Sequence, residues 1–360
     1  MSRYHSLAIT EVRRETSDAV SILLQVPDYL KDEFQFQAGQ FVNVRVILHG
    51  EEVRRSYSIC STPMSGALRV AVKKVSGGKF STYASDVLKP GDMLEVMPPE
   101  GKFTVRHEDE NGNTYVFFAA GSGITPVISL IKTILQTMPG MQVVLFYGNR
   151  TIDSIIFREE LDALKNLHLG RFELHHILSG EKQEVPLFNG RIDEDKCKTF
   201  AKVFFQIASV RRFFICGPEL MNFSLRNSLI ELGVDEKHIA IELFTTPGDK
   251  NLSPIHLTHK VAIDPKKECH VTVRIDGDTT EFSLAYGGQS ILDAATAAGV
   301  DVPFSCKGGV CCTCKAMLLD GEVDMDVVYG LEPDEVEDGF ILTCQSHPRS
   351  EIVLVDYDIR

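Results

Sequence analysis

The sequence reads Phe304-Ser-Cys-Lys-Gly-Gly-Val-Cys-Cys-Thr-Cys314 near its C-terminal end, and a further cysteine follows in Phe340-Ile-Leu-Thr-Cys344. The C-x4-C-x2-C…C spacing is the plant-type pattern for a [2Fe–2S] cluster. Glycine tolerates positive φ, so Gly308 and Gly309 allow a tight turn in which backbone N–H groups can reach the sulfurs. We therefore predict an electron-transfer protein whose metal ligands are Cys306, Cys311, Cys314 and Cys344.

Two other interpretations of these cysteines are a zinc site and unpaired structural thiols. Zinc motifs usually combine a C-x2-4-C pair with a second close pair, whereas Cys344 stands alone. A disulfide framework fits poorly with nine cysteines in 360 residues and no secretory signal. Cys312 lies between two predicted ligands, and we interpret it as a bystander, with ligand exchange as the alternative.

Length and composition indicate an ordinary globular protein. The 360 residues predict two or three domains, and 44% of the residues are apolar. Residues 1–15 are charged and lack the apolar run of a signal peptide. Residues 114–131 carry no charge, but Gly121, Gly123 and Pro126 indicate a strand, a turn and a helix start rather than a membrane span. We therefore expect a cytoplasmic protein.

Acidic side chains are concentrated toward the C-terminal end. The net charge is −13, and residues 251–360 hold 19 acidic and 8 basic side chains. Nine acids and no Lys or Arg lie between Asp320 and Asp338. This segment is either a solvated loop surface or a surface that steers a basic partner. Both interpretations argue against nucleic-acid binding.

Hydrophobic periodicity changes along the chain. Strand patterns such as Phe41–Leu48 and residues 68–75 predict an antiparallel barrel or sandwich in the first segment. From residue 111 to 247, apolar strands alternate with helical stretches, which predicts a parallel sheet with helices on both faces. We expect a linker over 248–268. Residues 269–360 begin with a hairpin around Asp276-Gly-Asp278 and a helix that Ser290 caps, in a capping box with Asp293, which favours a β-grasp-like domain.

The middle segment carries a glycine turn, Ala120-Gly-Ser-Gly-Ile-Thr-Pro126, between a strand and a helix. A helix N-terminus offers free N–H groups to a diphosphate, Thr125 is expected to cap the helix, and Pro126 suits its first turn. Asn149 and Arg150 close the next strand, where Arg150 could meet a 2′-phosphate or pair with Asp153. A tight structural turn is the alternative to a dinucleotide site.

The first segment contains two weaker signals. Arg55-Ser-Tyr-Ser58 lies on a predicted strand, where an Arg can hold a diphosphate and a Tyr can stack on a flat ring. Gly77-Gly-Lys-Phe-Ser81 is a second glycine turn before a helix-like stretch. Taken alone, the first motif is better explained by an alternating polar surface.

Taken in order, these motifs resemble the ferredoxin–NADP reductase superfamily with a C-terminal plant-type ferredoxin domain. The resemblance also rests on Cys216-Gly-Pro218 and Glu242-Leu-Phe244. It implies an FAD-binding β-barrel over 1–110, an NAD(P)-binding α/β domain over 111–247 and a β-grasp [2Fe–2S] domain over 269–360. Within the superfamily, Gly330-Leu-Glu-Pro-Asp-Glu335 and Thr343-Cys-Gln345 most resemble the reductase components of phenylacetyl-CoA epoxidases.

The resemblance implies roles for individual residues. Ser58 would bond the flavin N5, Cys216 would approach the nicotinamide, and Glu242 and Phe244 would return toward the flavin as further catalytic residues. The other residues implied at the FAD site are Arg55, Ser56, Tyr57, Val72, Lys73, Lys79, Phe80 and Ser81. Those implied at the nucleotide site are Gly121, Thr125, Pro126, Asn149, Arg150, Gly217, Pro218 and Met221. Ser179-Gly-Glu181 lacks the Ser-Arg pair of many NADP-binding members, so NADPH and NADH both stay open.

The cofactors implied are therefore FAD, a [2Fe–2S] cluster and NADPH or NADH. A nicotinamide gives two electrons as hydride and the cluster accepts one, and flavin can connect the two. The expected partner is a metal-containing oxygenase that docks near the acidic ferredoxin domain. Alternatives are a hydroxylase or desaturase partner, delivery to soluble ferredoxin, quinone or free flavin, and a non-enzymatic iron–sulfur carrier.

Overall fold

The computed structural model describes residues 4–105, 112–244 and 267–359. The chain divides into two compact units, one built largely from residues up to Phe244 and the other from the C-terminal residues. The predicted linker falls, up to residue 266, outside the described residues. No helix in the described ranges is long and apolar enough to cross a membrane.

The first domain of the larger unit is a six-stranded antiparallel sheet with the order β4-β3-β6-β1-β2-β5. An isolated antiparallel bridge between Ile59 and Val70 joins the two ends of this order, so the sheet closes on itself as the predicted barrel. The elements are β1 (His5–Thr16), β2 (Ala19–Gln25), β3 (Phe41–Leu48), β4 (Glu51–Ser58), β5 (Leu68–Lys73), α1 (Lys79–Asp86) and β6 (Met93–Val96).

The second domain is a five-stranded parallel sheet with the order β11-β10-β7-β8-β9. Its strands are β7 (Thr114–Ala120), β8 (Gln142–Asn149), β9 (Phe172–Leu178), β10 (Val210–Cys216) and β11 (Ile239–Glu242). Its helices are α2 (Ile124–Thr137), α3 (Arg158–Leu167), α4 (Glu194–Val203) and α5 (Glu219–Glu231).

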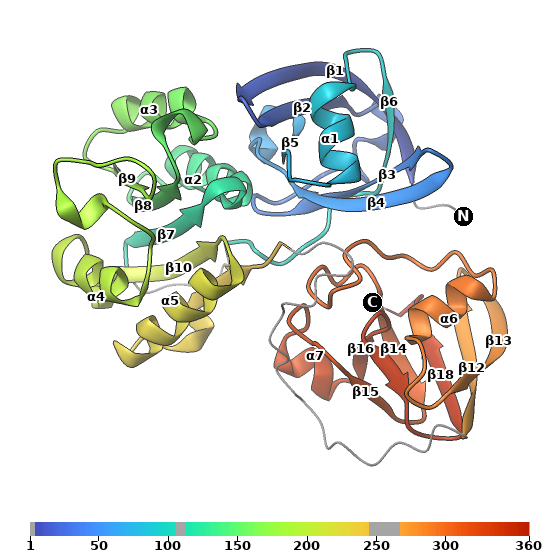
Figure 1. Ribbon diagram of the computed structural model, residues 1–360. Helices are drawn as coiled ribbons and strands as arrows, with labels where there is room; N and C mark the ends of the chain where they lie inside the picture. The colour runs from blue at the N-terminus through green and yellow to red at the C-terminus, as the bar shows by residue number, and fades with distance from the viewer. Residues whose placement is uncertain (1–3, 106–111, 245–266, 360) are drawn as a thin grey trace. The chain divides into compact units, whose positions relative to one another are not determined.

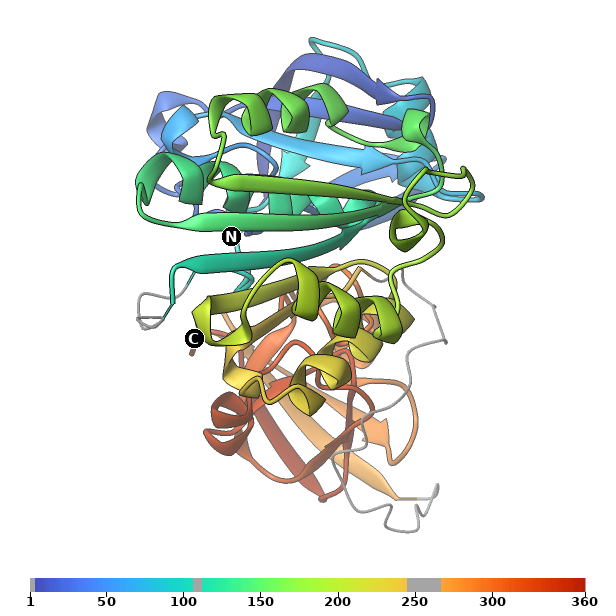
Figure 2. The ribbon, with the colours of Figure 1, turned by 90° about the vertical axis from the view of Figure 1, so that its left-hand side faces the viewer.

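Helices cover both faces of this sheet, as predicted. Along β7, Tyr115 and Phe117 pack in the cluster that contains residues of α2 and α3, whereas Val116 and Phe118 pack in the cluster of α4 and α5. Successive side chains of a strand point to opposite faces, and both faces are apolar here because both are covered. Figures 1 and 2 show the two helix layers on opposite sides of the sheet.

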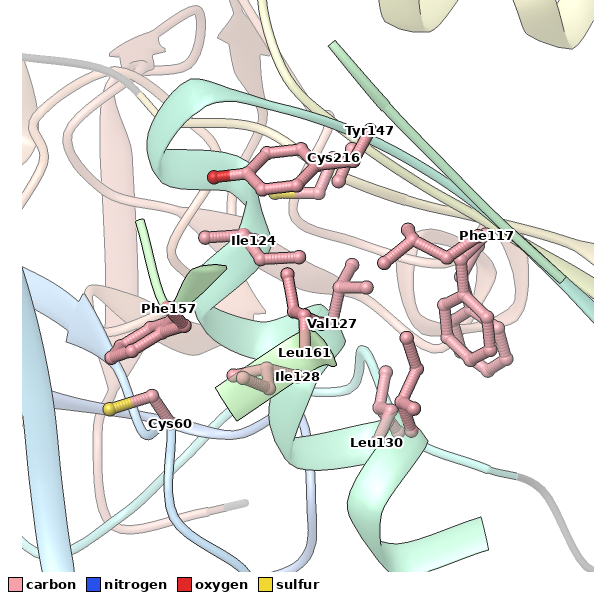
Figure 3. Close-up of a cluster of buried hydrophobic side chains, with 14 of the residues drawn as sticks. Cys60, Phe117, Ile124, Val127, Ile128, Leu130, Tyr147, Phe157, Leu161 and Cys216 are labelled. Carbon is pink, nitrogen blue, oxygen red and sulfur yellow. The ribbon is translucent and has the colours of Figure 1, made fainter. Parts of the chain in front are cut away.

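Helix α2 also joins the two domains of the larger unit. The Ser129 hydroxyl donates a hydrogen bond to the Ser61 carbonyl at 2.6 Å, and the Lys132 ammonium donates to the Cys60 carbonyl at 3.3 Å. Figure 3 shows Cys60 in one buried cluster with Ile128 of α2. The loop that leaves β4 is therefore held by the helix that follows the glycine turn.

The smaller unit contains a five-stranded sheet with the order β13-β12-β18-β14-β16, in which β12 and β18 are parallel and the other pairs antiparallel. Its elements are β12 (Glu268–Ile275), β13 (Asp278–Ala285), α6 (Ile291–Ala297), β14 (Lys315–Asp320), α7 (Pro333–Glu337), β16 (Phe340–Leu342) and β18 (Ile352–Asp356). A separate pair joins β15 (Val323–Met325) and β17 (Ser346–Pro348). This mixed sheet with helix α6 is the predicted β-grasp arrangement.

The local signals in this unit are largely confirmed. The hairpin turn places Asp276 and Gly277 at φ of 52° and 79°, as a two-residue type I′ turn requires. The Ser290 hydroxyl accepts a hydrogen bond from the Asp293 backbone N–H at 3.2 Å, which caps α6. The second half of the predicted capping box is wrong, because the Asp293 carboxylate pairs with Lys307 at 2.6 Å instead.

Candidate functional site

The predicted flavin motif lies at the end of β4, beside α1. The rings of Tyr57 and Phe80 pack with centroids 5.3 Å apart. The Ser81 hydroxyl accepts a hydrogen bond from the Val75 backbone N–H at 3.2 Å, which holds the turn before α1. A Cβ on Gly78 would lie 2.3 Å from that hydroxyl, so the turn requires glycine there. Lys79 at the start of α1 pairs with Glu51.

The Ser58 hydroxyl is the clearest sign of a ligand in this domain. Ser58 is 3% exposed, and its Oγ has no hydrogen-bond partner within the described part of the chain. A buried polar group without a partner costs about 1–3 kcal/mol. A flavin ring nitrogen at this position would satisfy the hydroxyl, so Ser58 fits the group that the motif implies.

Strand β5 brings predicted flavin residues close to the predicted nucleotide turn. The Lys73 ammonium pairs with Asp18 at 3.6 Å and lies 3.9 Å from the point that a Cβ on Gly121 would occupy. Val72 is fully buried, and β5 stands at the end of the sheet order. The structure therefore brings residues of both predicted cofactor motifs into one neighbourhood.

Arg55 is half-buried, and its guanidinium donates to the Arg54 carbonyl at 2.7 Å.

The glycine turn after β7 packs closely against the end of β10. A Cβ on Gly123 would lie 2.0 Å from the Cys216 carbonyl oxygen, and one on Gly217 would lie 2.4 Å from the Met221 Cε. The clash at Gly123 is with backbone, so this position requires glycine, and the turn lies directly against the carboxyl end of β10. Pro218 directly precedes α5.

The predicted capping role of Thr125 is wrong. Gly121–Gly123 forms a 3₁₀ turn that leads directly into α2, so Gly123 occupies the capping position. Thr125 is the second residue of the helix, and its hydroxyl donates to the Ser122 carbonyl at 3.0 Å. Pro126 lies in the first turn, as predicted.

Asn149 provides a second buried polar group that is poorly satisfied. The residue is 8% exposed, and neither amide atom makes a hydrogen bond of good geometry among the described residues, although the side chain lies beside the Tyr147 hydroxyl. It ends β8, at the carboxyl edge of the parallel sheet where ligands of such sheets bind. Arg150 follows it and is exposed, and no ion pair with Asp153 is found in the described ranges. The neighbouring Tyr147 hydroxyl donates to the Gly121 carbonyl at 2.9 Å.

Cys216 and Glu242 end the paired strands β10 and β11 in register. Burial, together with the nearby Glu242 carboxyl, raises the pKa of the Cys216 thiol well above its ordinary value. Burial also raises the pKa of Glu242 to about 8, although the side chain keeps partial solvent access. Both groups are therefore largely protonated near neutral pH. Phe244 lies just beyond β11 and is 46% exposed.

The four predicted cluster cysteines form two pairs. The Cys311 thiol hydrogen-bonds to Cys306, which lowers the pKa of Cys306 to about 6, and backbone N–H groups add to this effect. One of them, from Gly308, lies 3.3 Å from the Cys306 sulfur, as the glycines of the loop predicted. Cys314 and Cys344 form the second pair, and the hydrogen bond between them, with burial, raises the pKa of Cys314.

Two pairs of thiols fit a binuclear cluster, which needs two sulfurs for each iron. No group of three or more His, Cys, Asp or Glu side chains in the described residues is arranged to hold a single metal ion. The neighbouring Cys312 adopts a φ of 56°, and its thiol donates to the Gly330 carbonyl. The donor set and the backbone N–H groups therefore suit a [2Fe–2S] cluster.

Comparisons with known proteins agree with this arrangement. Three family models match: an oxidoreductase FAD-binding domain over residues 6–105, an oxidoreductase NAD-binding domain over 117–226 and a 2Fe-2S iron-sulfur cluster binding domain over 273–349. The chain is 41% identical over 360 residues to one of the subunits of the 1,2-phenylacetyl-CoA epoxidase from Escherichia coli (strain K12), covering 100% of this chain and 99% of that protein. The chain belongs to the ferredoxin–NADP reductase superfamily.

Other members of the superfamily align over nearly the whole chain. The ferredoxin reductase component of 3-ketosteroid-9-alpha-monooxygenase from Rhodococcus rhodochrous is 34% identical over 361 residues, covering 99% of this chain and 97% of that protein. The solved structure of phthalate dioxygenase reductase shares the fold with a TM-score of 0.59 and 23% identity, covering 98% of each chain. The protein is therefore a reductase with FAD-, NAD- and [2Fe–2S]-binding domains.

Some residues that shape the reductase's sites could not be recognised in the sequence. Ser129 and Lys132 hold the loop after the flavin motif, although they lie far from it in sequence. The Gln345 side chain contacts both the Lys307 carbonyl in the loop of three ligands and the sulfur of the fourth ligand, Cys344. Gln345 directly follows a predicted ligand, and this position was the one signal that could have indicated it.

Proposed function

We propose that this reductase takes hydride from NADH or NADPH and passes single electrons through FAD and its [2Fe–2S] cluster to an oxygenase of the phenylacetyl-CoA epoxidase type. The full-length similarity to the protein from the Escherichia coli epoxidase is the observation that carries the choice of partner. Reductases of other oxygenases also align over nearly the full chain. The order of electron transfer, from nicotinamide through FAD to the cluster, is therefore supported by more relatives than the choice of partner is.

When bound, FAD accepts a hydride and releases electrons singly, and the cluster accepts them one at a time. The protein contributes position and electrostatics. In this proposal, the backbone of the Gly121–Gly123 turn and the N-terminus of α2 bind the nucleotide diphosphate. The Ser58 hydroxyl fixes the flavin ring, and the amide of Asn149 binds the nucleotide.

Cys216 and Glu242 would line the nucleotide site with side chains that are protonated and uncharged near neutral pH. Because burial raises the pKa of Glu242 to about 8, its carboxyl is mostly protonated near neutral pH and would add little negative charge beside the site of hydride departure. The Cys216 thiol is neutral for the same reason of burial. We assign no nucleophile and no acid–base pair, since hydride transfer requires neither.

The acidic segment of the ferredoxin domain is the proposed docking surface. Six of its nine acids are exposed, namely Asp320, Glu322, Asp326, Asp334, Glu337 and Asp338. Within the described residues, Asp324 pairs with Arg349 and Glu335 pairs with Lys315 at 3.0 Å, so these two belong to the domain's own structure. The exposed acids support a partner with a basic surface, which they would attract in a salt-dependent manner.

Reconstitution tests this function. The purified reductase is mixed with the oxygenase component of a phenylacetyl-CoA epoxidase, and NADH or NADPH oxidation is measured together with epoxide formation. We expect coupled turnover that weakens as salt increases. An oxygenase component of 3-ketosteroid-9-alpha-monooxygenase serves as the comparison. Turnover with the steroid enzyme alone would reassign the partner, and reduction of cytochrome c without turnover of either oxygenase would favour a different acceptor.

A further inference from the structure

The fourth cysteine of the cluster site is held by the residues on both sides of it. The Thr343 hydroxyl donates a hydrogen bond to the Cys314 carbonyl at 2.9 Å, and the Thr343 backbone N–H reaches the same oxygen at 3.2 Å. The Tyr357 hydroxyl donates to Thr343 Oγ1 at 2.7 Å. Thr343 and Tyr357 are 0% and 2% exposed. This buried chain of hydrogen bonds fixes Cys344 relative to Cys314, its partner in one thiol pair.

Gln345 follows Cys344 and contacts the loop that carries Cys306 and Cys311, the other thiol pair. Its side-chain Nε2 lies 3.1 Å from the Lys307 carbonyl, 3.0 Å from the Cys344 carbonyl and 3.6 Å from the Cys344 sulfur. A Cβ on Gly309 would lie 3.0 Å from Gln345 Cγ, so the stem of this side chain packs against the loop. One amide therefore connects the isolated ligand to the loop that carries the other three.

The contact with Lys307 is informative because this residue has an unfavourable backbone conformation. Lys307 adopts a φ of 50°, in the left-handed region that non-glycine residues rarely occupy. It directly follows Cys306 and sets the direction in which the loop leaves that ligand. The hydrogen bond from Gln345 to the Lys307 carbonyl stabilises this conformation.

We propose that Gln345 is a positioning residue of the [2Fe–2S] site, which fixes Cys344 against the Lys307–Gly309 turn and donates an N–H toward the Cys344 sulfur. This inference rests on the electron-transfer function proposed above. Reduction adds negative charge to the cluster, and an N–H donor to a ligand sulfur stabilises that charge. Gln345 therefore raises the reduction potential and makes electron arrival more favourable.

Gln345→Met tests the proposal, because Met has a similar length and no N–H to donate. The control is Gln289→Met, which makes the same change at an exposed position of the same domain. The readout is the cluster's midpoint potential in an anaerobic redox titration of the full-length purified protein, followed by absorbance and electron paramagnetic resonance. We expect the cluster's reduction equilibrium in Gln345→Met to fall about tenfold, which is about 59 mV for one electron. The flavin potential and the control should stay at the wild-type value.

A second measurement covers the case in which the variant assembles poorly. The rate of cluster bleaching by an iron chelator is compared among the three proteins, and we expect it to rise several-fold in Gln345→Met only. Loss of iron in Gln345→Met, with the circular dichroism spectrum and FAD content unchanged, would also support the positioning role. An unchanged midpoint together with an unchanged bleaching rate would overturn the proposal. Because neither readout requires an oxygenase, failure of the proposed partner function would leave this test intact.

Discussion

Replacing Ser58 by Ala should have opposite effects on the flavin-free and flavin-loaded protein. In the flavin-free protein, the Ser58 hydroxyl is buried without a partner in the described structure, so removing it relieves a cost of up to about 1–3 kcal/mol. The variant should be at least as stable as the wild type. In the loaded protein, the same change removes a hydrogen bond to the flavin and should slow hydride transfer about tenfold. A tenfold change in rate corresponds to about 1.4 kcal/mol of activation free energy.

Ser61→Ala is the matched control, because Ser61 is also a buried serine just beyond β4 but its hydroxyl is satisfied. It donates to the Ala67 carbonyl at 2.5 Å and accepts from the Arg69 backbone N–H at 3.1 Å. Removing it leaves two backbone groups without this partner and should destabilise the barrel by about 1–3 kcal/mol. The two serine variants should therefore move stability in different directions.

Hydrogen exchange measured by mass spectrometry on peptides from the barrel strands reports this local stability. After FAD is removed, peptides of β3, β4 and β5 should exchange at least about fivefold faster in Ser61→Ala than in Ser58→Ala. Stopped-flow flavin reduction by NADH or NADPH measures the loaded proteins. Equal destabilisation of the flavin-free protein by both variants would show that the Ser58 hydroxyl has a structural partner and is not reserved for a ligand.

Three further changes test the cluster ligands, the glycine turn and the buried carboxyl. Cys311→Ser should abolish the iron–sulfur spectrum and cytochrome c reduction but leave NAD(P)H-dependent ferricyanide reduction largely intact, and loss of both activities would contradict the modular arrangement. Gly123→Ala places a Cβ 2.0 Å from the Cys216 carbonyl and should cost about 1–3 kcal/mol in thermal unfolding and weaken nucleotide binding, whereas Gly140→Ala, with nothing within 4 Å, should change neither. The raised pKa of Glu242, about 8, means that the folded state holds a proton more tightly than the unfolded state, so stability falls between about pH 4.5 and pH 8. Glu242→Gln should remove this fall in stability. In thermal unfolding, the stability of the variant relative to the wild type should therefore increase between about pH 4.5 and pH 8 and then level off. A difference that does not change with pH would place the carboxyl in solvent.

Periodicity and spacing predicted most of the architecture. The uniformly apolar β7 indicated a sheet covered on both faces, and Tyr115 and Val116 do pack into different clusters. Asp276-Gly277 indicated a two-residue hairpin, because both residues adopt positive φ there. The cysteine spacing brought four thiols together. Each of these features follows a periodicity or a spacing that is visible in the sequence itself.

Features that depend on distant contacts could not be predicted. Thr125 is a residue type that often caps helices. However, the preceding Gly121–Gly123 segment forms a 3₁₀ turn that leads into α2, so the helix begins earlier and Gly123 is its N-cap. Asp293 suited a capping box, but Lys307 competes for its carboxylate. Ser129 and Gln345 reach backbone carbonyls that the tertiary fold alone brings near them. For Asp293, Ser129 and Gln345, a partner outside the local pattern determines the geometry.

An anaerobic titration of the purified protein with NADH or NADPH measures electron transfer from the nicotinamide to the cluster. We expect the flavin and cluster absorption bands both to bleach and the paramagnetic signal of a reduced [2Fe–2S] cluster to appear, because the chain carries electrons from the nicotinamide to the thiolate-bound iron. A flavin that bleaches in a protein with full iron content, while the cluster stays oxidised, would contradict it.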